Sequence, residues 1–490
     1  MMNSKDAMSK SDLQAEEGAS VDKRKSLYGI EPNVRSASFS LSTFNMVNAL
    51  LGTGILGLPY AMGQLGIFLF FLFAVCIVSV ALFTIYLLLK MCEQTGVKEY
   101  EKIGFSAFGL SGRVIAALCI IGNNIGSISS YLLVIKYELP NVILSLMDET
   151  KLDGSWYYNG SILVIIVTCA VIVPLSSLTN IGFLGYTSGF SILCMVFFVI
   201  TVIFKKFTTP CPLLSEGIID NLTLFEAENF TAYMEESFSG FGSGDLISNA
   251  SGADFHYFNG SVSNFHLGHE EQQCDAAVFE FTDKWVYGLP TIIFAFSGHV
   301  GVLPIYAELK SPSTSRMQTV AFSAFTTCFT LYSLSAVFGY LTFYNWLEPE
   351  LLLTYNLTDQ SNLLTLLVRI CVLLTVIVTV PVNHFSMRKA INFILFPKKN
   401  FSWFRHIGIM LVSLAMILCF VIFVTNIREV YGIVGATTSN MVTFILPCVF
   451  FLKLDNSGLK SPIKIAAISI CVVGSGIMVQ TLCIIILGYF

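Results

Sequence analysis

The chain has 490 residues, of which 54% are hydrophobic and only 12% are charged, and its formal net charge is −5. Soluble domains contain about 25% charged residues. This composition, with a mean hydropathy of +0.73, therefore excludes an ordinary soluble protein and indicates a membrane protein.

Apolar runs of about 20 residues, long enough to cross a bilayer, predict an all-α polytopic membrane protein with eleven transmembrane helices. They lie near residues 38–62, 67–91, 113–138, 160–178, 181–204, 286–308, 320–344, 362–385, 404–424, 430–452 and 463–488. The polar stretch 1–37 lacks the apolar core of a signal peptide, and we predict a disordered cytosolic tail there. The rest, 38–490, is then one transporter domain that includes a long loop at 205–285.

Basic residues gather in alternate loops and predict the orientation of the chain. They are Lys23, Arg24, Lys25, Lys98, Lys102, Arg113, Lys310, Arg316, Arg388, Lys389, Lys398, Lys399, Arg405, Lys453, Lys460 and Lys464. The positive-inside rule assigns these loops and the N-terminus to the cytosol. Eleven spans then leave Phe490 outside. Lys205 and Lys206, at the end of the fifth span, lie on the opposite side by this count.

The loop 205–285 has the composition of an extracellular segment. Four asparagines in it open N-x-S/T triplets, which predicts glycosylation at Asn221, Asn229, Asn249 and Asn259. Cys211 and Cys274 are the two cysteines of the loop, while the other eleven fall within or at the ends of spans. Two cysteines in an oxidising compartment predict one disulfide; two free thiols are the alternative.

The first span contains "NALLGTGILGLPYAM" at 48–62, where three glycines and Pro59 interrupt an apolar run. Backbone that leaves the helix at membrane depth is tolerated only where it faces protein or a water-filled cavity. The exposed N–H and C=O groups of such a break can bind a carboxylate and a cation. Close helix packing through small residues is the alternative interpretation.

The sixth span repeats this pattern in "FAFSGHVGVLPIYAEL" at 294–309. Its "GVLPIYA" (301–307) resembles "GILGLPYA" (54–61), each with Gly-x-Leu, a proline and then Tyr-Ala. The two spans are five apart, so the halves of the chain run in opposite directions. Paired Gly/Pro-interrupted spans predict an inverted-repeat transporter with its substrate site at the breaks, which here include Ser297 and Gly298.

Several polar residues deep in other spans fit a site at this depth. Asn123 and Asn124 are costly in lipid unless they face a cavity or a partner, and Asn124 is a candidate substrate ligand. His299, beside the break in the sixth span, can change its charge near neutral pH. It is a candidate pH sensor, with a structural hydrogen bond as the equal alternative.

In the eighth span Thr375, Thr379 and Asn383 recur every four residues and share one helix face. Hydroxyl oxygens on one face suit a small cation such as Na⁺. The alternative is that each threonine bonds the carbonyl of residue i−4 in its own helix.

With these pieces the chain resembles the sodium-coupled neutral amino acid transporters of the amino acid/auxin permease group. The resemblance runs from about residue 40 to the C-terminus, with the long loop dissimilar, and rests on "FNMVNALLGTGILGLPYAM", "NNIGSISSYLLVIKYELP", "IGFLGYTSGFSILCMVFF", "VLPIYAELKSPS", "FGYLTFY" and "NFSWFRH". It implies eleven spans, a five-plus-five inverted repeat of the LeuT type with helices 1 and 6 broken, and uptake of small neutral amino acids with Na⁺.

The resemblance also implies roles for particular residues. Asn48 matches an asparagine implicated in sodium coupling, and Gly52, Thr53 and Gly54 match the motif whose amides hold the substrate carboxylate. Cys211 and Cys274 match the external disulfide of the family. Where known members have a sodium-binding threonine in the eighth span, this chain has Ile377. Thr379, which matches a second threonine nearby, is then the candidate ligand, with Thr375 beside it.

The sequence thus predicts a plasma-membrane secondary active transporter that imports small neutral amino acids with Na⁺. The alternatives are a proton-coupled or facilitative amino acid transporter of endolysosomal membranes and an amino acid sensor without transport. We find no nucleophile–base pair or phosphate-binding loop, so we expect no enzyme. We also expect no cofactor, no metal other than co-transported Na⁺ and no nucleic-acid partner.

Overall fold

The computed structural model describes residues 37–147, 158–178, 184–209, 274–279, 285–357, 362–396, 401–424, 426–458 and 460–487. The described residues before Thr208 and after Asp275 form one compact unit, which contains the candidate site. The predicted tail lies outside the described residues except for Ala37, and so do Cys211 and the four predicted glycosylation sites. Cys274 is disulfide-bonded, while its pairing with Cys211 stays a prediction.

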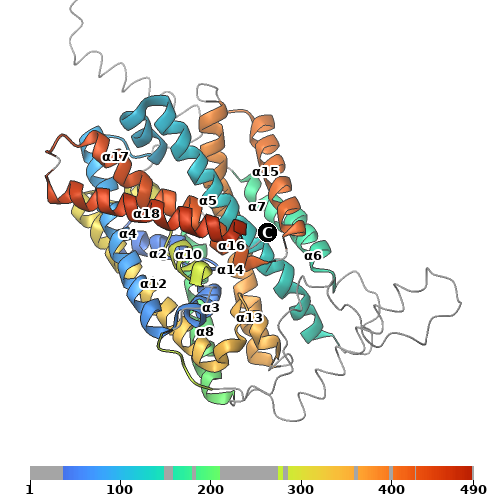
Figure 1. Cartoon of the computed structure of the whole chain (residues 1–490). Helices are drawn as coiled ribbons and strands as arrows, with labels where there is room; N and C mark the ends of the chain where they lie inside the picture. Colours follow the sequence, from blue (N-terminus) through green and yellow to red (C-terminus); the bar gives the residue numbers. More distant parts are fainter. Residues whose placement is uncertain are drawn as a thin grey trace, which may run out of the picture. The chain divides into compact units, whose positions relative to one another are not determined.

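The described residues are almost entirely helical, which confirms the predicted polytopic fold (Figure 1). Ten helical segments among them are long and apolar enough to cross a membrane, and a bent pair of shorter helices makes an eleventh. The bent pair is α2 (Phe39–Leu50) and α3 (Gly54–Leu65); the other segments are α4 (Ile67–Thr95), α5 (Tyr100–Leu146), α6 to α7 (Gly160–Ser177), α8 (Leu184–Thr208), α10 (Trp285–Ala295) with α11 (His299–Glu308), α12 (Thr314–Phe343), α14 (Leu363–Leu395), α15 (Trp403–Phe423), α16 (Ile427–Val434) to α17 (Leu446–Leu454), and α18 (Pro462–Leu487).

The helix boundaries follow the apolar runs closely, with α5 as the largest departure. It begins at Tyr100 rather than near residue 113, because a kink at Phe108 and Gly109 joins a short helical piece to the span. Gly109 has φ +62°, a conformation that favours glycine. A Cβ on Gly112 would lie 2.2 Å from the carbonyl oxygen of Gly104, so the tight kink also requires a second glycine.

Both predicted helix breaks are present, but they differ in shape. Helices α2 and α3 meet at an angle of 56° across Leu51–Thr53. Helices α10 and α11 are separated by Phe296–Gly298 and still form one span. Helix α3 lies beside α10 in the interior of the unit (Figure 1), which brings the two breaks together.

Of Lys205 and Lys206, which lie on the side opposite to the other basic residues, Lys206 has contacts that explain its position. Lys206 donates to the carbonyl oxygen of Leu341 near the end of α12, and its ammonium lies 5.2 Å from the ring centroid of Tyr344. Cations stabilise helix C-termini, where carbonyl groups lack partners. Lys206 therefore serves as a packing partner of α12, a role that a count of loop charges does not register.

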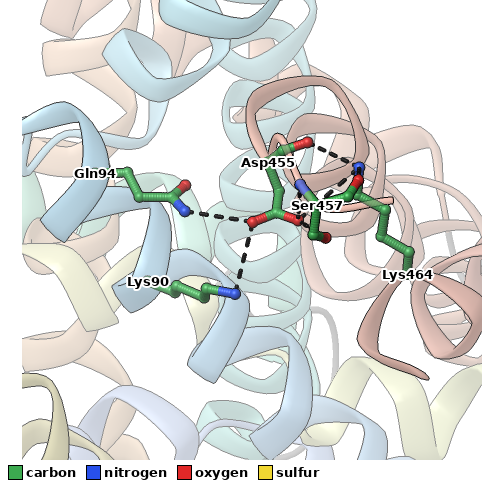
Figure 2. Close-up of polar contacts among 5 residues, drawn as sticks. All are labelled: Lys90, Gln94, Asp455, Ser457 and Lys464. Carbon is green, nitrogen blue, oxygen red and sulfur yellow. Dashed lines mark hydrogen bonds and ion pairs between the residues drawn. The ribbon is translucent and has the colours of Figure 1, made fainter. Parts of the chain in front are cut away.

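Asp455, between α17 and α18, ties these helices to α4. Its carboxylate lies 3.6 Å from the ammonium of Lys90 and 3.9 Å from that of Lys464, and it accepts from Gln94 at 3.4 Å. Figure 2 shows Lys90 and Gln94 approaching Asp455 from one side, and Ser457 and Lys464 from the other. The hydrogen bond from the Ser457 hydroxyl is the main cause that holds the pKa of Asp455 below its usual value of 3.8.

We expect Asp455→Asn to lower the Tm of the detergent-solubilised protein by a few degrees, because the neutral amide loses both ion pairs. A lowered pKa gives stabilisation that is complete above the ordinary pKa and is lost as the pH falls through the folded-state pKa. The Tm difference should therefore be equal at about pH 6 and about pH 8. Glu99→Gln is the control, because its ion pair with Lys102 is solvent-exposed and should contribute little. A Tm difference that grows between these pH values would contradict this account.

Candidate functional site

The two breaks line one cavity between α2, α3, α5, α10, α11 and α14. Its lining residues are Ala49, Leu50, Gly52, Gly54, Asn123, Asn124, Ser127, Tyr131, Phe294, Ala295, Ser297, Gly298, Val300, Gly301, Asn383 and Ser386. Five of the six predicted substrate residues belong to this set. Thr53 does not, because its side chain is buried and its hydroxyl lies 2.8 Å from that of Ser130 in α5.

Tyrosine and serine hydroxyls bond the carbonyl groups freed at the breaks. Tyr332 of α12 donates to the carbonyl oxygen of Leu50 at 2.6 Å and lies 3.3 Å from that of Ala295, so it contacts both breaks. Tyr431 of α16 donates to the carbonyl oxygen of Thr53 at 3.0 Å. Backbone groups at membrane depth must find such partners, and these tyrosines therefore stabilise the interrupted helices.

Pro59 requires a similar compensation within α3. Its ring nitrogen cannot bond the carbonyl of Ile55, four residues earlier. The Ser335 hydroxyl of α12 donates to this carbonyl oxygen at 3.3 Å instead. Helix α3 thus restarts directly after the break, and its first turn presents the N–H groups of Thr53 and Gly54, which have no acceptor within the helix. These groups form the positive end of the helix dipole.

Glycines allow the two broken spans to touch. A Cβ on Gly54 would lie 2.8 Å from both Cα and Cβ of Ala295. On the other side of the breaks, a Cβ on Gly298 would lie 2.6 Å from the Leu50 side chain. The close approach joins α3 to α10 and α2 to α11, so each half of one broken span packs against a half of the other. Both predicted interpretations of the glycines, close packing and a break, therefore hold at once.

A network of neutral side chains joins the α10–α11 break to α5 and the tenth span. The Asn123 amide oxygen lies 3.4 Å from the Ser297 hydroxyl and accepts from Ser439 at 2.7 Å. Thr443 contacts the Ser297 hydroxyl at 3.3 Å. Asn123 thus has the partners that its burial requires. Asn124 bonds the carbonyl of Ile120 in its own helix and also lines the cavity.

The prediction from sequence did not include Ser439 and Thr443. They lie in two π-helical turns, η6 (Gly435–Ser439) and η7 (Met441–Ile445), between α16 and α17. Such turns often mark functional positions within helices. The polar run "GATTSN" at 435–440 inside an apolar span was the available signal, since polar groups at membrane depth are costly without partners.

The predicted sodium residues lie apart from the lining of the cavity. The buried Asn48 amide oxygen has no hydrogen-bond partner among the described residues. Thr375 and Thr379 each donate to the carbonyl four residues earlier, at 2.9 and 2.7 Å, as in the alternative interpretation. Helix α2 packs mainly on α12 and α11. The sodium site therefore stays a prediction.

His299 begins α11 and is fully buried. Its Nε2 atom lies 2.9 Å from the Thr84 hydroxyl, which also bonds carbonyl oxygens of its own helix. The ring and the hydroxyl thus form one buried hydrogen bond between α11 and α4. The structure thus contains the structural hydrogen bond that was the alternative to pH sensing.

The route from the cavity along α3 is filled by side chains. Every residue from Gly54 to Met62 is buried. The Phe294 and Tyr431 rings pack at 5.2 Å between centroids. Further along α3, Arg428 donates to the Tyr60 hydroxyl at 3.3 Å and lies over the ring of Tyr287. Helix α2 is more open, since Ala49, which lines the cavity, is exposed. The cavity is therefore closed on the α3 side.

Comparison with known proteins agrees with this architecture. A family model described as "Transmembrane amino acid transporter protein" matches residues 35–225 and 254–487. The chain is 41% identical over 472 residues to sodium-coupled neutral amino acid transporter 4 of Homo sapiens. The matched region covers 94% of this chain and 86% of the relative. It is 40% identical over 466 residues to sodium-coupled neutral amino acid symporter 2 of Danio rerio, with 95% and 85% covered. On this evidence the chain belongs to the transmembrane amino acid transporter family.

Proposed function

We propose that this protein is a secondary active transporter that imports small neutral amino acids together with Na⁺. The observation that carries the proposal is the cavity shared by two broken spans. It occurs in a chain whose relatives are named for sodium-coupled transport of neutral amino acids. Substrate sites at paired helix breaks are typical of transporters built from inverted repeats.

The chemistry of the lining favours a zwitterion without net charge. None of the described residues that line the cavity is Asp, Glu, Lys, Arg or His. A charged substrate side chain would therefore lack a counter-charge at membrane depth, which is costly. The N–H groups of Thr53 and Gly54 at the start of α3 suit the substrate carboxylate. The hydroxyl of Ser297 and the carbonyl groups near the second break suit the ammonium group.

The one-sided opening of the cavity supports a role in alternating access. With the N-terminus assigned to the cytosol by the basic residues, the open α2 side faces inward and the closed α3 side faces outward. Ala49 of α2 and Asn383 of α14 both line the open cavity. In this inward-facing state a sodium site between Asn48 and Thr379 would be incomplete. Release of Na⁺ to the cytosol with the amino acid follows from such an arrangement.

Uptake of radiolabelled alanine into proteoliposomes tests the proposal. We expect an inward Na⁺ gradient to drive accumulation and expect replacement of Na⁺ by choline to abolish it. Accumulation driven by an inward proton gradient without Na⁺ would instead favour the proton-coupled transporter of endolysosomal membranes. Saturable binding without uptake under either gradient would favour the sensor. Surface labelling of cells that express the protein tests the proposed plasma-membrane location.

A further inference from the structure

A short segment between α12 and α14 covers the closed end of α3. We call residues 347–356 the cap segment; it contains α13 (Leu351–Thr354) and part of η5 (Tyr355–Leu357). Leu351 lies against Gly339 of α12, where a glycine Cβ would lie 3.2 Å from it, and Leu347 lies near Gly63 of α3. Leu351 and Leu352 are fully buried. The cap segment thus packs into the unit at the end of α3 farthest from the break.

Arg369 of α14 forms hydrogen bonds to the cap segment. Its Nη2 atom donates to the carbonyl oxygen of Leu352 at 3.2 Å and to the side-chain oxygen of Asn356. Its Nε atom lies 3.4 Å from a carboxylate oxygen of Glu138 in α5. The guanidinium is only 2% exposed. One buried side chain therefore connects the cap segment to two membrane-spanning helices.

Among the described residues near the Arg369 guanidinium, two buried carboxyl groups face this one positive charge. Glu350, which precedes α13, and Glu138 are both fully buried, and neither carboxylate has a hydrogen-bond partner among the described residues. Within the part of the chain that the structure describes, Arg369 is the one cation that acts on Glu350, while Glu138 acts on it with like charge. Burial is the main cause that raises the pKa of Glu350 well above its usual value, and Glu138 adds to it.

Glu348 of the cap segment is exposed, and the other titratable groups near Glu350 among the described residues are phenols, which are neutral at physiological pH. Glu350 acts on Tyr137 of α5 and on Tyr431 of α16, and Tyr355 follows α13 in the cap segment itself. Helices α3 and α12 face the cap segment with Gly63 and Gly339. With both glutamates ionised, the buried group would carry a net negative charge, and buried groups avoid such a charge by binding a proton.

We propose that the cap segment is a lid over the outward mouth of the transport path, that Arg369 latches it, and that Glu350 binds one external proton when it closes. The outward orientation rests on the proposed function. When the lid opens, Glu350 reaches water and releases the proton. By linkage, acid outside favours the closed lid and alkali the open one. For one proton, the ratio of closed to open lids changes by at most about tenfold per pH unit.

Thiol labelling from outside measures the lid directly, without transport. Leu351→Cys places a thiol on a buried face of the lid, and Glu348→Cys places one on its exposed face. A membrane-impermeant reagent is applied outside cells or oriented vesicles between about pH 5.5 and about pH 8. Because thiol reactivity itself changes with pH, the quantity of interest is the ratio of the two labelling rates, after subtraction of labelling in the parent.

The ratio is the labelling rate at Leu351→Cys divided by the rate at Glu348→Cys. We expect this ratio to rise with pH when Glu350 is present. With Glu350→Gln it should stay low and independent of pH, because glutamine is always neutral. Arg369→Lys keeps the charge but shortens the reach to Leu352 and Asn356, so it should raise the ratio at every pH. A pH-dependent ratio that survives Glu350→Gln, or none in the parent, overturns the proton site. An unchanged ratio with Arg369→Lys overturns the latch. Since no substrate or Na⁺ is needed, these outcomes are independent of the alanine uptake test.

Discussion

Gly54→Val is expected to abolish amino acid uptake while leaving the amount of protein in the membrane near that of the parent. A side chain at this position would place its Cβ 2.8 Å from the Cα and Cβ atoms of Ala295. Real Cβ atoms do not approach backbone so closely, so the two broken spans would have to separate. The N–H groups at the start of α3 would then lose their position relative to the second break, and a displacement of about 1 Å can reduce a rate about 100-fold.

Gly476→Val in α18 is the matched control. It introduces the same β-branched residue into a membrane-spanning helix, and no atom lies within 4 Å of its added Cβ. Uptake of radiolabelled alanine, divided by the amount of surface-labelled protein, checks both variants. Uptake at the parent rate with Gly54→Val would remove the α2–α3 break from the substrate site.

Loss of an oxygen at the predicted sodium site should have the second-largest effect. Asn48→Ala removes a buried amide oxygen that has no hydrogen-bond partner among the described residues, and Thr379→Ala removes a hydroxyl on α14. We expect each variant to raise the Na⁺ concentration for half-maximal uptake, by about tenfold if the lost contact is worth about 1.4 kcal/mol. The apparent affinity for the amino acid should fall too, because coupling between two ligands is reciprocal.

Thr330→Ala provides a control for the hydroxyl. Thr330 donates to the carbonyl of Thr326 at 3.0 Å, as Thr379 does to that of Thr375, but it lies on the exposed face of α12. A Na⁺ titration of uptake separates the variants. An unchanged Na⁺ dependence in both Asn48→Ala and Thr379→Ala, with the Thr330→Ala control also unchanged, would exclude this pair as sodium ligands.

Local sequence patterns were sufficient to predict the spans and the breaks. Apolar run length determines which segments can cross a bilayer. Glycine and proline near the middle of a run weaken the helix at a known position. Gly52, Gly54 and Pro59 therefore predicted the bend between α2 and α3, and the similar motif at 301–307 indicated the break that precedes it in the sixth span.

The partners of these residues could not be predicted, because they come from distant helices. Tyr332 and Tyr431 bond the carbonyls at the first break from α12 and α16. Arg369 and Glu138 pair across more than two hundred residues of sequence. Each of these is a polar residue in an apolar span, which is unusual. Its position in the sequence indicates that it needs a partner but does not identify that partner. His299 likewise could not be assigned to Thr84 without the packing of α4 against α11.

Topology from charge counting shows the same limit. Lys206 contradicts the positive-inside pattern when loops are counted. In the folded chain it bonds the Leu341 carbonyl and packs over Tyr344, so its position reflects helix packing. The positive-inside rule applies to basic residues in loops without tertiary contacts, so it does not predict the side of a lysine that packs on another helix.

A structure determined by electron cryomicroscopy with alanine and Na⁺ present tests the central claim most directly. The claim is that the amino acid binds in the cavity between the two breaks. We predict density for the amino acid there, with its carboxylate at the N–H groups of Thr53 and Gly54 and its ammonium group toward Ser297. Alanine density at another place in the protein, with this cavity free of it, would contradict the account.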